Sequence, residues 1–171
     1  MKAVMLNSAD KLAGVHGSVR TSIDSNDMDW TESEAFASQF TSLDDQMGAG
    51  HLNVRRAVQQ LQLGEYGPGE IPLIGWDFGS IGGVGSTAEY VVDQLGADQY
   101  IAITLVWDRR IESTGGSTHN VGDQFTSHGV ANLDLRRETT GGSTIWTSQT
   151  FEDNVEHIFS VILMLASIRL S

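Results

Sequence analysis

Histidines beside glycine and serine are the first residues of this chain whose spacing suggests nucleophilic catalysis. His16 precedes Gly17-Ser18, and His128 precedes Gly129. A serine nucleophile needs a histidine to take its proton and an aspartate to orient that histidine. Neither histidine has a matching nucleophile motif. Paired-carboxylate, Cys-His and phosphate-loop signatures are also missing from the sequence. We therefore assign no catalytic residue, and no cofactor other than the calcium considered next.

Acidic side chains in the second half of the chain offer hard oxygen ligands for calcium. The candidates are Asp123, Asp134 and Asp153, the last with Asn154 and Glu156 close by in sequence. No Asp-x-Asp-x-Asp-Gly loop is present, and an aspartate on the polar face of a strand is more simply a solvated or turn-bonding side chain. A structural calcium at the three aspartates is thus the alternative to ordinary surface carboxylates.

Aromatic side chains raise a carbohydrate alternative, because an exposed row of rings can stack on sugars. The candidates are Tyr90, Trp76, Trp107 and Trp146, and three of them lie inside apolar, strand-like runs. Core packing is therefore the better account of these rings. We interpret His157, which lies in another such run, as a hydrogen-bonded structural histidine.

Composition limits the classes of partner. Asp and Glu number 22 against 10 Lys and Arg, which gives a formal net charge of -12. This charge argues against nucleic acid or an anionic membrane surface as partner. The chain has no cysteine, which excludes disulfides and thiolate metal sites. No run reads as a signal peptide, and the apolar run 158–170 is too short for a membrane span and contains Arg169.

The elements that would position these residues fall into two parts. Residues 1–63 read as helical at both ends, with a helix over 53–63 that places Val54, Val58 and Leu61 on one apolar face. Thr31 and Glu34 have the spacing of a capping box at the start of a short helix. Residues 64–72 contain three glycines and both prolines of the chain, so we place a linker and domain boundary there.

Residues 73–171 read as a β domain of short strands separated by turns. The expected strands are 73–77, 88–93, 100–107, 131–136, 144–148 and 155–159. In 100–107 one face is strongly apolar and the other mixed, which is typical of a half-buried strand. The fold class is therefore α+β: a short helical segment over 1–63 followed by an antiparallel β-sandwich or jelly roll. The run 158–170 fits a buried strand, a buried helix or an out-of-register tail.

Two phrases in the helical segment resemble the C-terminal end of a subtilisin-like serine protease domain. The first is residues 1–9, a helix-like run ending in Asn7-Ser8-Ala9. The second is residues 48–58, with Gly48, Gly50, Asn53 and Ala57 in the family's Gly-x-Gly-x-x-Asn-x-x-x-Ala spacing. The family's serine phrase, Gly-Thr-Ser-Met-Ala, and its His-Gly-Thr-His phrase do not occur here. The resemblance implies that the catalytic residues lie upstream and that 1–63 is the helical remnant of a catalytic domain.

The β part resembles the β-sandwich appended to some secreted subtilisin-like proteins, a domain similar to pre-peptidase C-terminal domains. The phrases that carry this resemblance are 103–109, 132–135 and 153–158. The family pattern continues with a Gly-x-Tyr-x-Leu-x-Val strand, which is replaced here by 160–171. We therefore expect the last strand to be altered or missing, and a truncated or frame-shifted reading frame would account for this departure.

The two resemblances imply a non-catalytic C-terminal portion of a secreted or cell-surface serine protease. Its partners would be the upstream catalytic domain and a polypeptide or polysaccharide substrate, and its sandwich would act in stabilisation, maturation or substrate or matrix binding. The alternative is an autonomous β-sandwich module that binds carbohydrate or protein.

Overall fold

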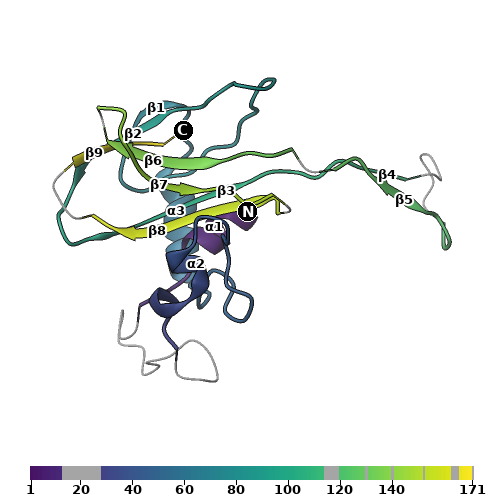
Figure 1. The fold of residues 1–171 in the computed structure, drawn as a ribbon, viewed down its shortest axis with the longest axis horizontal. Coiled ribbons are helices and arrows are strands. Elements are labelled where there is room, and N and C mark those ends of the chain that lie inside the picture. The colour runs from purple at the N-terminus through teal and green to yellow at the C-terminus, as the bar shows by residue number, and fades with distance from the viewer. Residues whose placement is uncertain are drawn as a thin grey trace.

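The computed structural model describes residues 1–12, 28–113, 120–129, 131–139, 141–151, 153–162 and 166–170 of the 171-residue chain. Short helices occupy the N-terminal part, and strands, mostly antiparallel, make up the rest (Figure 1). The expected mixed α+β class with a predominance of β structure is thereby confirmed. None of the helices in the described ranges is long and apolar enough to cross a membrane.

The two helices at the ends of the N-terminal segment form as their sequences predict. Helix α1 (Lys2–Asn7) buries Val4, and helix α3 (Val54–Leu63) begins at Asn53. The Oδ1 atom of Asn53 accepts a 2.9 Å hydrogen bond from the backbone N–H of Arg56, as an N-cap residue does. Helix α3 ends at Gly64, whose φ of 115° suits glycine.

The helix start predicted at Thr31 is wrong by two residues. A short 3-10 turn, η2 (Trp30–Glu32), precedes helix α2 (Glu34–Ala37), whose N-cap is Ser33. The hydroxyl oxygen of Ser33 accepts a 3.3 Å bond from the Phe36 N–H and also donates to the Trp30 carbonyl. Ser33 is a better cap here because Trp30 is completely buried and fixes the turn before it.

Five strands form the larger sheet, in the order β1-β2-β9-β6-β7. Strands β1 and β2 are parallel and the other pairs antiparallel. The bounds of these strands are β1 (Gly69–Ile71), β2 (Tyr90–Leu95), β6 (Leu135–Thr139), β7 (Thr144–Ser148) and β9 (Ala166–Leu170).

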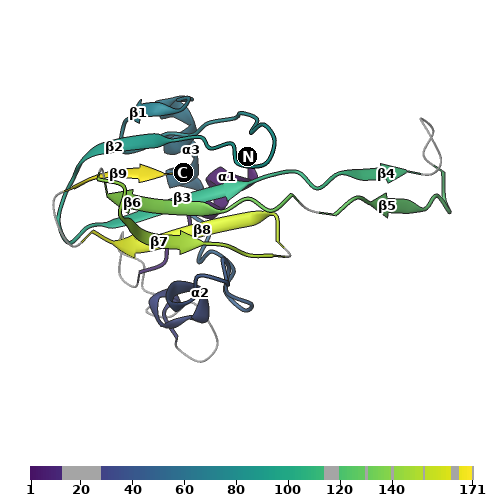
Figure 2. The same cartoon turned by 45° about the horizontal axis from the view of Figure 1, so that its top comes forward.

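A separate antiparallel pair is formed by β3 (Tyr100–Val106) and β8 (Val155–Val161). One face of this pair is directed at the larger sheet, where Ile101 and Ile103 pack against Val92, Leu95 and Ile162. The opposite face contacts the N-terminal segment (Figure 2), because α1 packs on β3 and the Phe159 ring packs in the cluster around Trp30. The β3–β8 pair thus lies between two layers and has a core on each side, whereas the half-buried strand expected from the apolar and mixed faces of β3 would pack on one side only.

A third pair, β4 (Ile111–Ser113) and β5 (Phe125–Ser127), projects from the body as an arm (Figures 1 and 2). Its apolar side chains Ile111 and Phe125 are exposed. The sequence does not predict this arm, since each strand has only three residues.

The remaining strand predictions have mixed outcomes. Those for β2, β3, β7 and β8 are confirmed within a few residues, whereas the strand expected over 131–136 is wrong because β6 begins only at Leu135. The β6–β7 turn sets this register: the Thr139 N–H donates to the Ser143 carbonyl (2.8 Å), and Gly142 has a φ of 83°. Within 158–170, β8 continues to Val161 and β9 follows at Ala166.

No strand forms over 73–77, where only an isolated bridge joins Glu65 and Trp76. The backbone of this segment bonds to the end of α3 instead: the Trp76 N–H donates to the Gly64 carbonyl at 3.3 Å. Gly75 lies against the Tyr66 ring, where an added Cβ would come within 2.6 Å of a ring carbon. Residues 73–77 therefore form a loop over the side of α3. The linker assigned to 64–72 stays a prediction.

Candidate functional site

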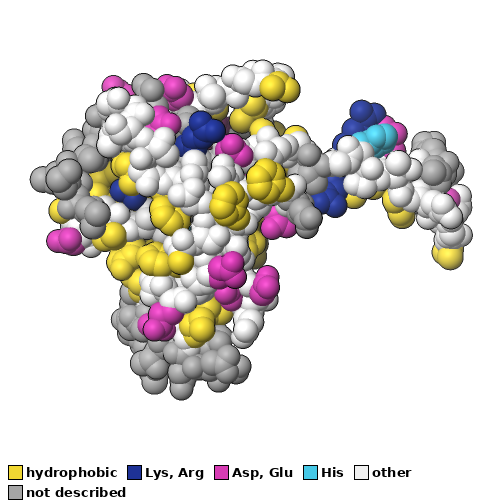
Figure 3. Space-filling model, viewed as in Figure 1, with side chains coloured by type: hydrophobic (Ala, Val, Ile, Leu, Met, Phe, Trp, Pro, Cys, Tyr) yellow, Lys and Arg dark blue, Asp and Glu magenta, His cyan; other side chains and the backbone are white. Residues whose placement is uncertain are grey.

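The histidines considered for catalysis do not form a triad in the described part of the chain. His16 lies outside the described residues. His128 follows β5 on the arm, where its Nε2 atom lies 2.9 Å from Glu112 Oε2, and Arg110 pairs with the same carboxylate. These side chains gather on the surface of the projecting arm (Figure 3). His128 therefore takes part in an exposed polar cluster with Glu112 and Arg110.

The three calcium candidates are used locally or exposed. Asp123 accepts a 2.7 Å hydrogen bond from the Asn120 N–H in the loop of the arm. Asp134 pairs with Arg136 at 3.4 Å, and Asp153 is exposed before β8. Across the described ranges, no three His, Cys, Asp or Glu side chains are grouped so that they could hold a metal ion.

The aromatic candidates are all half-buried. The indole N–H of Trp107 donates to the Ala131 carbonyl at 2.7 Å, and that of Trp76 donates to the Leu61 carbonyl at 3.3 Å. The Tyr90 hydroxyl donates to Asp77 Oδ2 at 2.6 Å. Burial, together with the neighbouring Asp77 carboxylate, raises the pKa of Tyr90. The rings of Trp76, Tyr90 and Trp107 are thus each held in place by a hydrogen bond from their polar atom.

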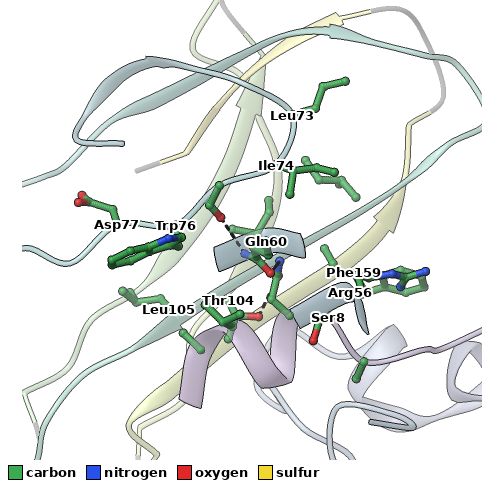
Figure 4. A pocket seen from close by; sticks show the side chains of 18 of the residues that line it. Ser8, Arg56, Gln60, Leu73, Ile74, Trp76, Asp77, Thr104, Leu105 and Phe159 are labelled. Atoms are coloured by element: carbon green, nitrogen blue, oxygen red, sulfur yellow. Dashed lines mark hydrogen bonds between the residues drawn. The ribbon is translucent and has the colours of Figure 1, made fainter. Parts of the chain in front are cut away.

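A cavity of about 910 Å³ opens between the N-terminal helices and strand β3. Its walls come from α1, α3, the 71–78 segment, β2 and the whole length of β3. Leu73 and Ile74 lie at one side, and Trp76 and Leu105 lie at another (Figure 4). We call this cavity the groove. Its size and mostly apolar lining are those of a ligand-binding site.

A chain of side-chain hydrogen bonds forms the floor of the groove (Figure 4). Gln60 on α3 donates from Nε2 to the Gly75 carbonyl at 2.7 Å and accepts at Oε1 from Asn7 Nδ2 at 3.4 Å. Asn7 Oδ1 in turn accepts a 3.1 Å bond from the Thr104 hydroxyl on β3. The chain joins α1, α3, β3 and the 71–78 segment, so it fixes the groove's shape and leaves few of its polar side-chain atoms for a ligand.

His157 on β8 extends this chain into the core. Its Nδ1 atom lies 2.7 Å from the Thr104 hydroxyl oxygen, which donates its own proton to Asn7. Nδ1 therefore carries the proton and donates. Nε2 is buried and has no hydrogen-bond partner among the described residues. Burial, with a smaller contribution from the positive charge of Lys11, holds the pKa of His157 well below its ordinary value, so the imidazole is neutral at pH 7.

Lys11 follows α1 in the chain and contributes to the lining of the groove, although it is only 2 % exposed. Its ammonium lies 5.5 Å from the Trp30 ring centre and 5.2 Å from that of Phe159, and it donates to the Ala9 carbonyl at 3.3 Å. Burial and the nearby Arg56 lower the pKa of Lys11 to about 7. The aromatic rings and one carbonyl thus replace only part of the hydration that this cation would have in water.

Glu156 is completely buried on the other face of β8. Oε1 accepts hydrogen bonds from the Thr150 N–H (2.6 Å) and hydroxyl (2.9 Å), and Oε2 accepts from the Ser42 hydroxyl (2.8 Å) and from Ser148. We call these four residues the Glu156 cluster. Both carboxylate oxygens are satisfied by donors from the N-terminal segment and from the chain around β7 and β8. The cluster is closed to solvent and ties these segments together.

Comparisons of this chain with protein-family models, with curated proteins and with solved structures found no match. The site must therefore be interpreted from its own geometry. The described groove has a concave surface lined by apolar side chains and by backbone groups of β3, which suits non-covalent binding of a ligand. Sequence reasoning missed its polar floor and the Glu156 cluster, because these side chains meet only through contacts between distant segments.

Proposed function

We propose that this chain forms the non-catalytic C-terminal part of a secreted subtilisin-like serine protease. In this proposal the β region is an accessory β-sandwich that stabilises the catalytic domain, assists its maturation or binds substrate. The observation that carries the proposal is that the second phrase resembling the end of the protease domain, residues 48–58, packs against helix α1 of the first phrase, residues 1–9, and against Asp10, which directly follows that phrase.

This contact gives two distinctive residues of the second phrase, Gly50 and Asn53, a physical role. Asp10, which directly follows the first phrase, and His51 exchange two backbone hydrogen bonds of 2.8 Å. Gly50 lies so close to this bridge that a Cβ would be 2.5 Å from the Asp10 carbonyl oxygen. Asn53 donates from Nδ2 to Asp10 Oδ2 at 2.8 Å while its Oδ1 caps α3. The Gly-x-Gly-x-x-Asn spacing thus suits a turn packed on the end of α1, which supports a common origin of the two phrases.

The exposed face of α3 also supports the proposal. The helix contacts the rest of the chain through Ala57 and Gln60, which are buried. Val54 and Val58, which the sequence predicts on the apolar face, are 61 % and 45 % exposed. An apolar stripe of this kind is a plausible surface for the remaining part of a catalytic domain.

The arrangement of the strands is compatible with an accessory sandwich. The β3–β8 pair faces the five-stranded sheet through an apolar interface that contains Ile103 and Val92. Two facing sheets with apolar inner faces are the basis of a β-sandwich. The accessory sandwich and the secretion of the protein are parts of this proposal.

The test begins with the nucleotide sequence upstream of Met1. The proposal expects an open frame there that encodes the Asp and His phrases and Gly-Thr-Ser-Met-Ala. The complete product is then expressed with and without residues 73–171, and casein hydrolysis and thermal unfolding are measured. Loss of mature, active enzyme on truncation would support the accessory role. An upstream region without such a frame would refute the proposal.

A matched pair of variants tests the α3 surface in the same complete product. Val58→Ser removes an apolar side chain from the exposed stripe, whereas Val84→Ser removes one from a fully exposed loop. We expect the first to lower the yield of active enzyme and the second to leave it unchanged. Equal yields for the two variants would remove this support.

The groove favours a second candidate, an autonomous module that binds protein or carbohydrate. The groove is lined by residues from α1, α3, the 71–78 segment, β2 and β3 of this chain. Purified chain that is monomeric and binds such a ligand, with no protease frame upstream, would favour this alternative.

A further inference from the structure

Strand β3 has one edge that pairs with β8 and one edge that faces the groove. The register pairs Ile103 with Ile158 and Leu105 with Glu156. Beyond the two ends of this ladder, the Trp107 N–H donates to the Asn154 carbonyl and the Ile162 N–H donates to the Gln99 carbonyl. Hydrogen-bonded pairs in an antiparallel ladder recur at every second residue. The odd-numbered residues of β3 therefore bond to β8.

The even-numbered residues of β3 direct their backbone groups to the other edge. They are Tyr100, Ala102, Thr104 and Val106. Within the described ranges, no strand pairs with this edge, and all of β3 lines the groove. A row of unpaired N–H and C=O groups at the side of a cavity is a template for another strand.

We propose that this free edge of β3 binds an extended polypeptide segment, which adds to it as a strand and places alternate apolar side chains in the groove. This inference deepens the binding role included in the proposed function and rests on it, but it does not require a protease ancestry. With seven residues in β3, and a rise of about 3.3 Å per residue, the strand would pair with a segment of about six to eight residues.

The chemistry of the groove favours a polypeptide over a sugar. Sugar hydroxyls need many free polar side chains, but Asn7, Gln60 and Thr104 on the floor already bond to one another. Among the described residues, the groups on the β3 side that no strand pairs with are backbone amides and carbonyls at a regular spacing, which an extended peptide complements. The wall formed by Leu73 and Ile74 suits apolar side chains.

Charge favours a cationic segment. The chain carries a net charge of -12, and Asp77 and Asp108 line the groove. Lys2, Lys11 and Arg56 also line it, but Lys11 is buried, Arg56 pairs with Asp10 at 3.2 Å and Lys2 donates to Asn154 Oδ1 at 3.5 Å. A peptide that alternates valine and lysine therefore matches both the apolar wall and the overall field.

The test uses the full chain and a capped synthetic peptide of about four Val-Lys repeats. Its affinity is measured by isothermal titration calorimetry. A second peptide carries N-methyl groups on alternate residues, which removes the donors that would pair with β3, and a third replaces lysine with glutamate. We expect micromolar binding of the first peptide and at least about tenfold weaker binding of the other two, because several hydrogen bonds or favourable charges are lost.

A protein variant tests the same edge. Ala102→Pro removes an N–H that points away from β8, so the pairing with β8 is kept, and proline is tolerated at such edge positions. Ala102→Val keeps the N–H and is the matched control. We expect Ala102→Pro to weaken binding of the Val-Lys peptide by about tenfold or more and Ala102→Val to bind almost as tightly as the wild type. If Ala102→Pro does not fold, the methylated peptide still decides.

Two outcomes would overturn the inference. One is binding that is absent or unaffected by N-methylation. The other is a dimer in sedimentation velocity that Ala102→Pro dissolves, which would assign the edge to a second copy of this chain. Neither outcome depends on the sequence upstream of Met1, so failure here is distinguishable from failure of the proposed protease assignment.

Discussion

The two strands of the β3–β8 pair have the same length and pair in register, yet their surroundings differ. Strand β8 carries Glu156, His157 and Ile158, which are all at most 2 % exposed. Strand β3 is half-buried over most of its length and has one edge at the groove. Both strands have one edge that no described strand pairs with, but the side chains of β8 are packed more completely than those of β3.

This difference assigns different roles to the two strands: β8 should determine stability, and the open edge of β3 should determine binding. The cost of removing a buried, bonded group is large, since its partners stay desolvated, so β8 should control the free energy of unfolding. Groups on the open edge of β3 have no such partners in the described structure and are free to meet a ligand. The predictions below test this separation, from the largest expected effect to the smallest.

Glu156→Ala should give the largest loss of stability. It leaves three hydroxyls and one amide of the Glu156 cluster without their acceptor inside the core, which should lower the free energy of unfolding by about 4 kcal/mol. Urea unfolding followed by circular dichroism measures this change. Asp153→Asn, at an exposed site in the same segment, is the control and should change it by less than about 0.5 kcal/mol. Similar losses for both variants would contradict the closed character of β8.

The sequence predicts the local elements on both sides of this comparison. Helix α3 follows from its Asn53 cap and its periodicity, and β3 follows from the alternation of Ile101, Ile103 and Leu105 with its mixed face. These signals act between neighbours in the chain, so one sequence suffices to detect them.

Contacts between distant segments were not predictable. Ser42 and Glu156 are separated by 114 positions, and neither has a local pattern that indicates the other. Gln60 is buried in place of Val58 because its amide bonds to Asn7 and to the Gly75 carbonyl. Such tertiary bonds override the apolar periodicity that predicts which face of a helix is buried.

Lys11 should make stability rise with pH above neutrality. Its pKa is lowered to about 7 in the folded chain, whereas in the unfolded chain it has the ordinary value of about 10.4. The unfolded state therefore binds more protons between these values, so stability increases as pH rises through this window. From about pH 7 to about pH 9.5 the increase from this group should be about 3 kcal/mol.

Lys11→Met is the test of this assignment. The variant keeps the apolar stem that packs on Trp30 and Phe159 but has no charge to bury. Its free energy of unfolding should exceed that of the wild type at pH 7, and the difference should shrink toward pH 9.5. Lys2→Met, at an exposed site, should leave the wild-type pH profile intact. Parallel profiles for the wild type and Lys11→Met would contradict the burial of this cation.

The titration of His157 should also make the free energy of unfolding rise with pH, but in the acidic range and by a smaller amount. Burial lowers its pKa in the folded chain, so its contribution is fully present above the ordinary value of about 6.5 and is lost as pH falls below it. The loss is at most about 1.4 kcal/mol per pH unit, or about 2 kcal/mol between pH 6.5 and 5.

His157→Gln keeps a donor for Thr104 and removes the titration. Urea unfolding at pH 7 and pH 5 should show a smaller loss for this variant than for the wild type. His51→Gln, at an exposed position, is the control and should behave as the wild type. An equal loss in all three proteins would show that other groups control the acid response. Strand β8 would then not determine the pH dependence of stability.

The smallest effect on stability is expected on the open side. Leu73 and Ile74 at the wall of the groove are 58 % and 51 % exposed, so each already loses little surface on folding. Leu73→Ser should lower the free energy of unfolding by less than about 1 kcal/mol. The same variant should weaken binding of the Val-Lys peptide, since Leu73 is exposed in the free chain and would make its apolar contact with the peptide in the complex. A loss comparable to that of Glu156→Ala would mean that the groove wall stabilises the fold, and the separation between the closed β8 side and the open β3 side would fail.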